Sequence, residues 1–167
     1  MGRETSPFLF SMKFISTKEY NKIHKQLSEI DKTFAEMWKR FERMVFDNDE
    51  ETVALDIDNA NFRIIANNKF WKKCGDETKV FIICHEMCHA MFGHWMYPEK
   101  YYREWANVAQ DIQVNEFLFK NYNFSKSITK VADCATIETV FKHKSNLIER
   151  DRNYTYYYDL LMKCLKS

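Results

Sequence analysis

His85-Glu86-Met87-Cys88-His89 is the stretch of this chain that decides its interpretation. Its two histidines are four residues apart, and residues at i and i+4 lie on the same face of an α-helix. His85 and His89 can therefore direct their ring nitrogens at one metal ion. Glu86 is displaced around the helix, towards the place where a water molecule would bind that metal. This spacing is typical of a helical zinc peptidase site.

The residues before this motif predict a buried helix. The run Val80-Phe81-Ile82-Ile83-Cys84 is apolar on all sides of a helix. Two imidazoles and a carboxylate are costly to bury unless they share a partner. A bound metal ion would be that partner, so we prefer a metal site to a helix with two core histidines. We interpret Cys84 and Cys88 as small core residues.

The ends of this helix are also marked in the sequence. Cys74-Gly75-Asp76 predicts a turn in which Asp76 is the N-cap. Gly93, followed by Pro98, predicts the end of the helix.

A third metal ligand is needed, because a catalytic zinc has three protein ligands and one open position. We predict Asp111, a carboxylate on a later helix that is otherwise rich in Ala, Val and Ile. Asn115 lies one turn further on the same face. Asn115 could therefore orient His85 or His89 through a second ring nitrogen.

Other residues remain alternatives for the third ligand. His94 could reach the metal if the chain turns at Gly93. Otherwise His94 could stabilise a substrate oxyanion by hydrogen bonding, or cap the helix. Glu104 and Glu116 are the remaining carboxylate alternatives.

Length and composition indicate one domain, residues 1–167, because a chain of this size can bury a single sizeable core. Five cysteines, an odd number without paired spacing, argue against a disulfide framework and for a reducing compartment. No stretch resembles a signal peptide or a membrane span. We therefore expect a cytoplasmic protein that does not bind a membrane.

The charge pattern disfavours a nucleic-acid partner. The chain has 25 basic and 24 acidic residues, and they are mixed along its length. Two short clusters combine lysines with aromatic or imidazole side chains: Lys69–Lys73 and Lys142–Lys144. We interpret both clusters as solvated surface.

The N-terminal third contains a periodic apolar pattern. From Tyr20 to Met44 the apolar residues are separated by alternating steps of three and four. This spacing predicts one long amphipathic helix, with Ser16 or Thr17 as its cap. The acidic run Asp47–Glu51 is expected to end it.

The remaining elements complete an α+β chain that is mostly helical. Thr52–Ile57 and Asn61–Ala66 flank the turn residues Asp58-Asn59-Ala60 and predict a β-hairpin. Two further helices are expected at Trp105–Lys120 and Tyr154–Leu165.

Three segments between Asn61 and Leu118 carry a family resemblance: Arg63–Phe70, His85–His94 and Asn107–Asn115. They resemble the N-terminal metallopeptidase domain of bacterial VWA-like proteins. The pattern of that family is a strand ending in an Asn-containing turn, then H-E-x-x-H-x-x-x-x-H, then Asn-x-Ala-x-Asp-x-x-x-Asn. Tyr154–Lys163 resembles the closing helix of the family more loosely. Asn68 stands where the family usually has Pro, and no VWA domain follows.

The resemblance implies a zincin-like metallopeptidase fold, with a small β-hairpin or sheet beside the active-site helix and Asp111 as the third ligand. The arrangement is more distantly similar to gluzincin peptidases, in which a Glu on a later helix binds zinc and an Asp one turn on supports a histidine. Asp111 and Asn115 would be the counterparts. The missing VWA domain implies that a separate partner protein could take its place.

These observations predict a zinc metallopeptidase that acts on a protein or peptide substrate. Zn²⁺ held by His85, His89 and Asp111 would activate a water molecule, and Glu86 would be the general base. The substrate backbone would pair with the hairpin edge near Ile64-Ile65-Ala66. The alternative is a zinc-containing regulatory or binding module that has a peptidase fold but no physiological proteolysis.

Overall fold

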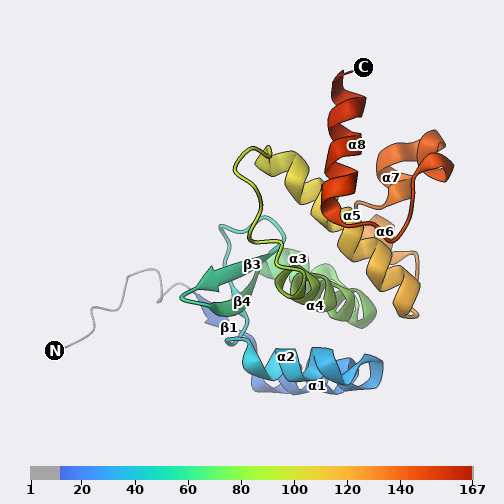
Figure 1. Ribbon diagram of the computed structural model, residues 1–167. Helices are drawn as coiled ribbons and strands as arrows, with labels where there is room; N and C mark the ends of the chain where they lie inside the picture. The colour runs from blue at the N-terminus through green and yellow to red at the C-terminus, as the bar shows by residue number, and fades with distance from the viewer. Residues whose placement is uncertain (1–11, 167) are drawn as a thin grey trace. The chain divides into compact units, whose positions relative to one another are not determined.

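The structure is a computed structural model that describes residues 12–166 (Figure 1). The chain is an α+β protein, mostly helical, with a small four-stranded mixed sheet. Two compact units, residues 1–87 and 88–167, meet within helix α4 (Asp76–Met91) and are described separately. The expectation of a single domain stays a prediction.

The sheet of the first unit has the strand order β1-β2-β4-β3. Its strands are β1 (Lys13–Phe14), β2 (Val45–Phe46), β3 (Val53–Asp58) and β4 (Asn61–Ala66). Strands β3 and β4 form the predicted antiparallel hairpin, which is confirmed. Its turn residues, Asn59 and Ala60, have φ angles of 47° and 66°. Positive φ at both central residues is the geometry that matches the right-handed twist of a two-residue hairpin.

Strand β4 is an inner strand, which overturns one expectation. Ile65 lies opposite Val45 of the parallel strand β2 on one side and opposite Ala54 of the antiparallel strand β3 on the other. The segment Ile64-Ile65-Ala66 therefore has no open edge, and the prediction that a substrate pairs there is wrong. Strand β2 has only two residues, too few for a recognisable alternating pattern, so this pairing was not predictable from the sequence.

The predicted long helix is wrong, because two helices occupy this segment: α1 (Thr17–Ile30) and α2 (Lys32–Arg40). They meet at Asp31, whose backbone is extended, with φ −162° and ψ 125°. The Asp31 backbone N–H donates to the carbonyl of Leu27, and its carboxylate accepts from the Thr33 N–H at 2.8 Å. Asp31 thus ends one helix and caps the next. The predicted Ser16 cap is confirmed.

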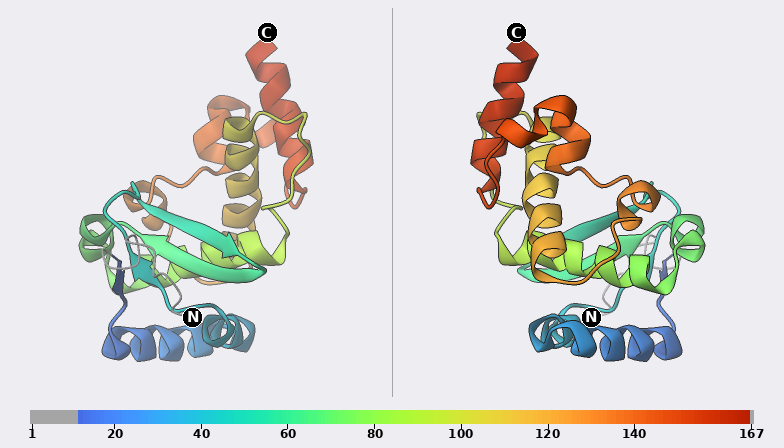
Figure 2. Two further views of the ribbon diagram at one scale, coloured as in Figure 1. Left: turned by 90° about the vertical axis from the view of Figure 1, so that its left-hand side faces the viewer. Right: turned by 90° about the vertical axis from the view of Figure 1, so that its right-hand side faces the viewer.

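Helices α3 (Asn68–Lys73) and α4 complete the first unit. The Glu19 carboxylate accepts from Trp71 Nε1 at 2.7 Å and from Lys79 Nζ at 3.0 Å, and so links α1, α3 and α4. The prediction of Asp76 as the N-cap is wrong by one residue, because Asp76 is already the first residue of α4. The carbonyl of the preceding residue, Gly75, accepts the Lys79 N–H at 3.0 Å. Figure 2 shows the α1–α2 pair on one side of the sheet.

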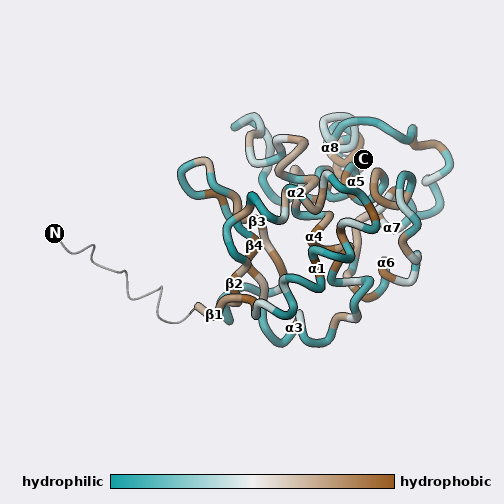
Figure 3. Tube along the Cα trace, turned by 90° about the horizontal axis from the view of Figure 1, so that it is seen from below, coloured by the Kyte–Doolittle hydropathy of each residue, from teal (hydrophilic) through white to brown (hydrophobic). Residues whose placement is uncertain are grey.

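The core of the first unit is made of apolar side chains from the helices and from β4. Its fully buried members include Ile23, Leu27, Phe34, Ile64, Trp71, Phe81, Ile83 and Met87. Apolar and hydrophilic residues alternate along the helices (Figure 3). This alternation is the pattern that lets a helix bury one face.

The second unit is built around α5 (Arg103–Asn121) and α8 (Tyr154–Lys166), which lie side by side (Figure 1). Its smaller elements are α6 (Ile128–Val131), α7 (Ile137–Phe141) and the 3₁₀ helix η2 (Lys142–Leu147). The buried cluster of this unit consists of Ala106, Ala109, Ile112, Ile137, Phe141, Tyr157, Tyr158 and Leu161. None of the helices formed by residues 12–166 has the length and apolar composition needed to cross a membrane.

Asp31→Ala is expected to lower the free energy of unfolding by about 1 kcal/mol, because the Thr33 N–H loses its capping acceptor. Urea denaturation followed by far-UV circular dichroism measures the change. Asp31→Asn is the matched control, since its side-chain oxygen can still accept this hydrogen bond. Equal destabilisation by both substitutions would show that capping is not the role of Asp31.

Candidate metal centre

His85 and His89 are only partly buried, whereas the other residues between Val80 and Cys88 of helix α4 are buried. Cys84, Met87 and Cys88 are completely buried, which confirms that the two cysteines are core residues. Glu86 is buried as well, with 7% of its surface exposed. The two histidines are one turn apart on a continuous helix, so the spacing of their Cα atoms is fixed by helix geometry.

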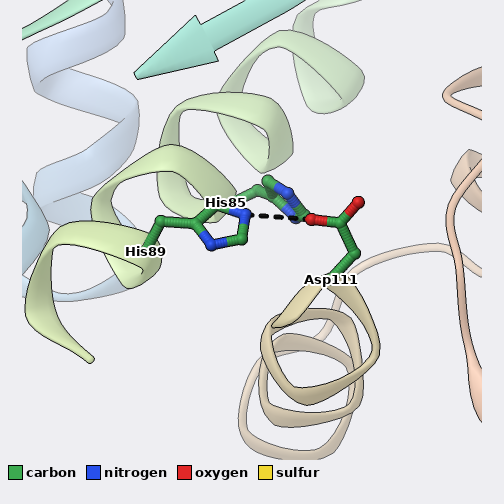
Figure 4. Close-up of side chains that lie close together, drawn as sticks. All are labelled: His85, His89 and Asp111. Atoms are coloured by element: carbon green, nitrogen blue, oxygen red, sulfur yellow. Dashed lines mark hydrogen bonds and ion pairs between the residues drawn. The ribbon is translucent and has the colours of Figure 1, made fainter. Parts of the chain in front are cut away.

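Asp111 of α5 joins the two histidines in a group that could hold a metal ion. Each of the three residues offers one ligand atom, and these atoms lie within 4.8 Å of one another. Figure 4 shows the Asp111 carboxylate directed at the two rings. His89 Nε2 and Asp111 Oδ1 are 3.0 Å apart. The structure therefore brings together the three ligands predicted from the sequence.

The donor set fits a zinc ion. With Zn–ligand bonds of about 2.0–2.1 Å, two ligands of a tetrahedral site lie roughly 3.3 Å apart. The His89–Asp111 separation of 3.0 Å is close to this distance. The widest separation in the group, within 4.8 Å, has to close by no more than about 1.5 Å. Two imidazoles and one carboxylate also leave the fourth position open, as in catalytic zinc sites.

Gly93 ends α4 and turns the chain back beside His89, as predicted. The His94 N–H donates to the His89 carbonyl at 3.0 Å, and the Gly93 N–H donates to the Ala90 carbonyl at 3.2 Å. Gly93 has a φ of +67°. These two hydrogen bonds and the left-handed residue form a Schellman motif, which favours glycine. The motif places His94 directly after the turn.

The His94 ring contacts His89 and lies outside the group of three residues that could hold a metal ion. His94 Nδ1 lies 2.9 Å from His89 Nδ1, and His94 Nε2 lies 2.9 Å from Gln113 Oε1. Only 3% of His94 is exposed. Both ring nitrogens thus have protein partners, and this arrangement supports neither the metal-ligand role nor the oxyanion role that we considered as alternatives for His94. Gln113 was not predicted as a site residue, because no local pattern in the sequence marks it.

The two glutamates considered as third ligands lie outside the group. Glu116 of α5 accepts the N–H of Ile137, the first residue of α7, at 2.9 Å and pairs with Arg150 at 2.8 Å. Glu104 is exposed in the first turn of α5.

Asn115 is almost fully buried, with 1% of its surface exposed. Its Nδ2 donates to the Ala135 carbonyl at 2.8 Å. The second ring nitrogen of His89 faces His94 rather than Asn115. Support of His85 by Asn115 stays a prediction.

No protein-family model, no curated protein and no solved structure matches this chain. The resemblance to the metallopeptidase domain of VWA-like proteins therefore stays a prediction from the sequence. The chemistry of the site is inferred from its geometry.

Removal of one ligand is expected to abolish tight Zn²⁺ binding. His89→Ala and Asp111→Ala should each weaken binding by more than the roughly 10- to 100-fold that loss of an outer hydrogen-bond partner causes. Competition with a chromophoric chelator measures the affinity, and elemental mass spectrometry measures the bound metal. His143→Ala, which changes an exposed histidine of η2, is the matched control and should bind like the wild type. Wild-type affinity in Asp111→Ala would exclude Asp111 as a ligand.

Proposed function

We propose that the protein is a zinc-dependent peptidase. The observation that carries this proposal is the group of His85, His89 and Asp111, with a buried carboxylate, Glu86, directly after the first ligand. Zn²⁺ bound there would acidify the attacking water and polarise the carbonyl of the scissile peptide bond. The substrate is accordingly a protein or a peptide.

The three ligands have a positioning role. Their side chains come from two helices, α4 and α5, and not from loops. Sites on rigid elements hold reacting groups more accurately than sites on loops. The open side of a three-ligand site is where the substrate carbonyl is placed against the attacking water.

Glu86 is the proton carrier in this proposal. Glu86 directly follows His85 on the helix and therefore lies about 100° around the helix axis from it. A carboxylate beside the open position accepts the proton of the attacking water and then delivers it to the leaving amine nitrogen. Glu86 therefore carries the proton from the attacking water to the leaving amine, and no other acid is required.

Glu86→Gln tests this role, because the amide retains the size of the side chain and cannot accept the proton. We expect kcat/KM for a fluorogenic peptide library to fall by about 10²- to 10⁴-fold, while the zinc content stays the same. Glu77→Gln, in the exposed first turn of α4, is the matched control and should retain wild-type activity.

Two results would contradict the proposal. Wild-type hydrolysis by Glu86→Gln would remove Glu86 from the mechanism. Absence of peptide or casein hydrolysis by zinc-loaded wild-type protein would reject the peptidase function and favour a zinc-containing binding module.

A further inference from the structure

A chain of hydrogen bonds leads from the backbone of α8 to the ligand His89, and all of its members lie within residues 88–167. The Tyr154 N–H contacts Gln113 Oε1 at 3.0 Å. The same oxygen lies 2.9 Å from His94 Nε2, and His94 Nδ1 lies 2.9 Å from His89 Nδ1. The remaining ring nitrogen, His89 Nε2, faces the Asp111 carboxylate.

The direction of each hydrogen bond in this chain follows from its first member. A backbone N–H can only donate, so the amide atom of Gln113 that faces Tyr154 is its oxygen, and this oxygen accepts. His94 Nε2 contacts the same oxygen and must therefore carry a proton and donate it. A neutral imidazole has one donor and one acceptor, so His94 Nδ1 is an acceptor.

The same reasoning determines the proton on the ligand. Since His94 Nδ1 accepts, His89 Nδ1 must donate to it across the 2.9 Å contact. The proton of a neutral His89 is then on Nδ1, and Nε2 and the Asp111 carboxylate face each other as two acceptors that a cation between them would stabilise. Nε2 is also the atom that lies 3.0 Å from Asp111 Oδ1. The hydrogen-bond chain therefore leaves unprotonated the one nitrogen that points into the ligand group.

We propose that His94 and Gln113 are positioning residues that fix the tautomer and ring orientation of His89, so that Nε2 binds the metal. This inference rests on the metal-binding part of the proposed function. A metal-bound histidine usually donates its other N–H to a nearby acceptor, which fixes the ring and raises its basicity as a ligand. Here the acceptor is a second histidine, and Gln113 sets its tautomer in turn.

The surroundings hold this chain in one arrangement. The Gly93 turn places His94, and Gln110 Nε2 donates to the His94 carbonyl at 2.8 Å. The His94 ring packs edge-on against the Tyr154 ring at 5.2 Å. A ring held by both its backbone and its neighbours cannot rotate without the loss of several contacts.

The position of Tyr154 connects the ligand to a second helix. Tyr154 is the first residue of α8, and the first N–H groups of a helix have no partner within that helix. Gln113 thus serves two elements: it caps α8 and orients His94. Metal affinity should consequently depend on the docking of α8 against α5.

Long-range ¹H–¹⁵N spectra of the histidine rings test the assignment in the zinc-loaded wild-type protein. We expect His89 to coordinate through Nε2 and carry its proton on Nδ1, and His94 to carry its proton on Nε2. Coordination of His89 through Nδ1, or a His94 proton on Nδ1, would overturn the proposal. The His94 tautomer can also be determined without metal, where the same result is expected.

Substitutions of Gln113 test its effect on affinity. Gln113→Leu removes the acceptor, and Zn²⁺ binding should weaken by about 10- to 100-fold. Gln113→Glu keeps an acceptor for both donors and should restore affinity to within a few-fold of the wild type. Gln110→Leu is the matched control: it lies one turn earlier on α5, removes a hydrogen bond to the same histidine and leaves the ring nitrogens untouched. Equal weakening by the two Leu variants would mean that the effect is general loosening, and would overturn the proposal.

These measurements do not depend on hydrolysis. A protein that shows the expected tautomers and affinities but cleaves no peptide would retain this inference and lose the proposed peptidase activity. Peptide cleavage that depends on Glu86, combined with a His89 proton on Nε2, would retain the proposed peptidase activity and overturn this inference.

Discussion

The cost of burying polar groups on α4 is the constraint on which the site depends. Several residues of this helix, such as Cys84 and Met87, are completely buried. The same helix carries two imidazoles and the carboxylate of Glu86. Buried polar groups are stable only with partners, because the interior offers no water to replace them. His94, after the Gly93 turn, lies 2.9 Å from His89 Nδ1, and the Asp111 carboxylate of α5 lies 3.0 Å from His89 Nε2. The polar side chains on α5 are thereby explained as the complement of those on α4.

The parts of the structure that depend on local sequence could be predicted. The i, i+4 spacing of the ligands, the two-residue hairpin turn and the Schellman end at Gly93 each need only a few adjacent residues. Asp111 could be predicted because a carboxylate on an apolar helix requires a partner. The helix break at Asp31 could not, since the apolar spacing continues through it and only the extended backbone of this one residue separates α1 from α2.

Features that depend on distant residues were not predictable from one sequence. Strand β2 pairs with β4 through two residue pairs, Val45–Ile65 and Phe46–Ala66, and such short strands show no periodicity. Gln113 is 41 residues from Tyr154 along the chain. Its contacts with Tyr154 and His94 exist only once α8 has packed on α5, so no local pattern could mark this residue. Asn115, which its spacing from Asp111 had suggested as the residue that orients His85 or His89, donates to the Ala135 carbonyl.

Two imidazoles and one carboxylate form a donor set that ferrous oxygenases also use, so the ligands alone do not distinguish redox from hydrolytic chemistry. The role proposed for Glu86 favours hydrolysis, because hydrolysis would use a group that takes up and returns a proton at the open side of the metal. In the proposed arrangement the proton of His89 is held between two nitrogens 2.9 Å apart and is not available for exchange with substrate. In this arrangement Asp111 would be occupied as a metal ligand. In the proposed peptidase, proton transfer would therefore fall to Glu86, which directly follows His85 on helix α4.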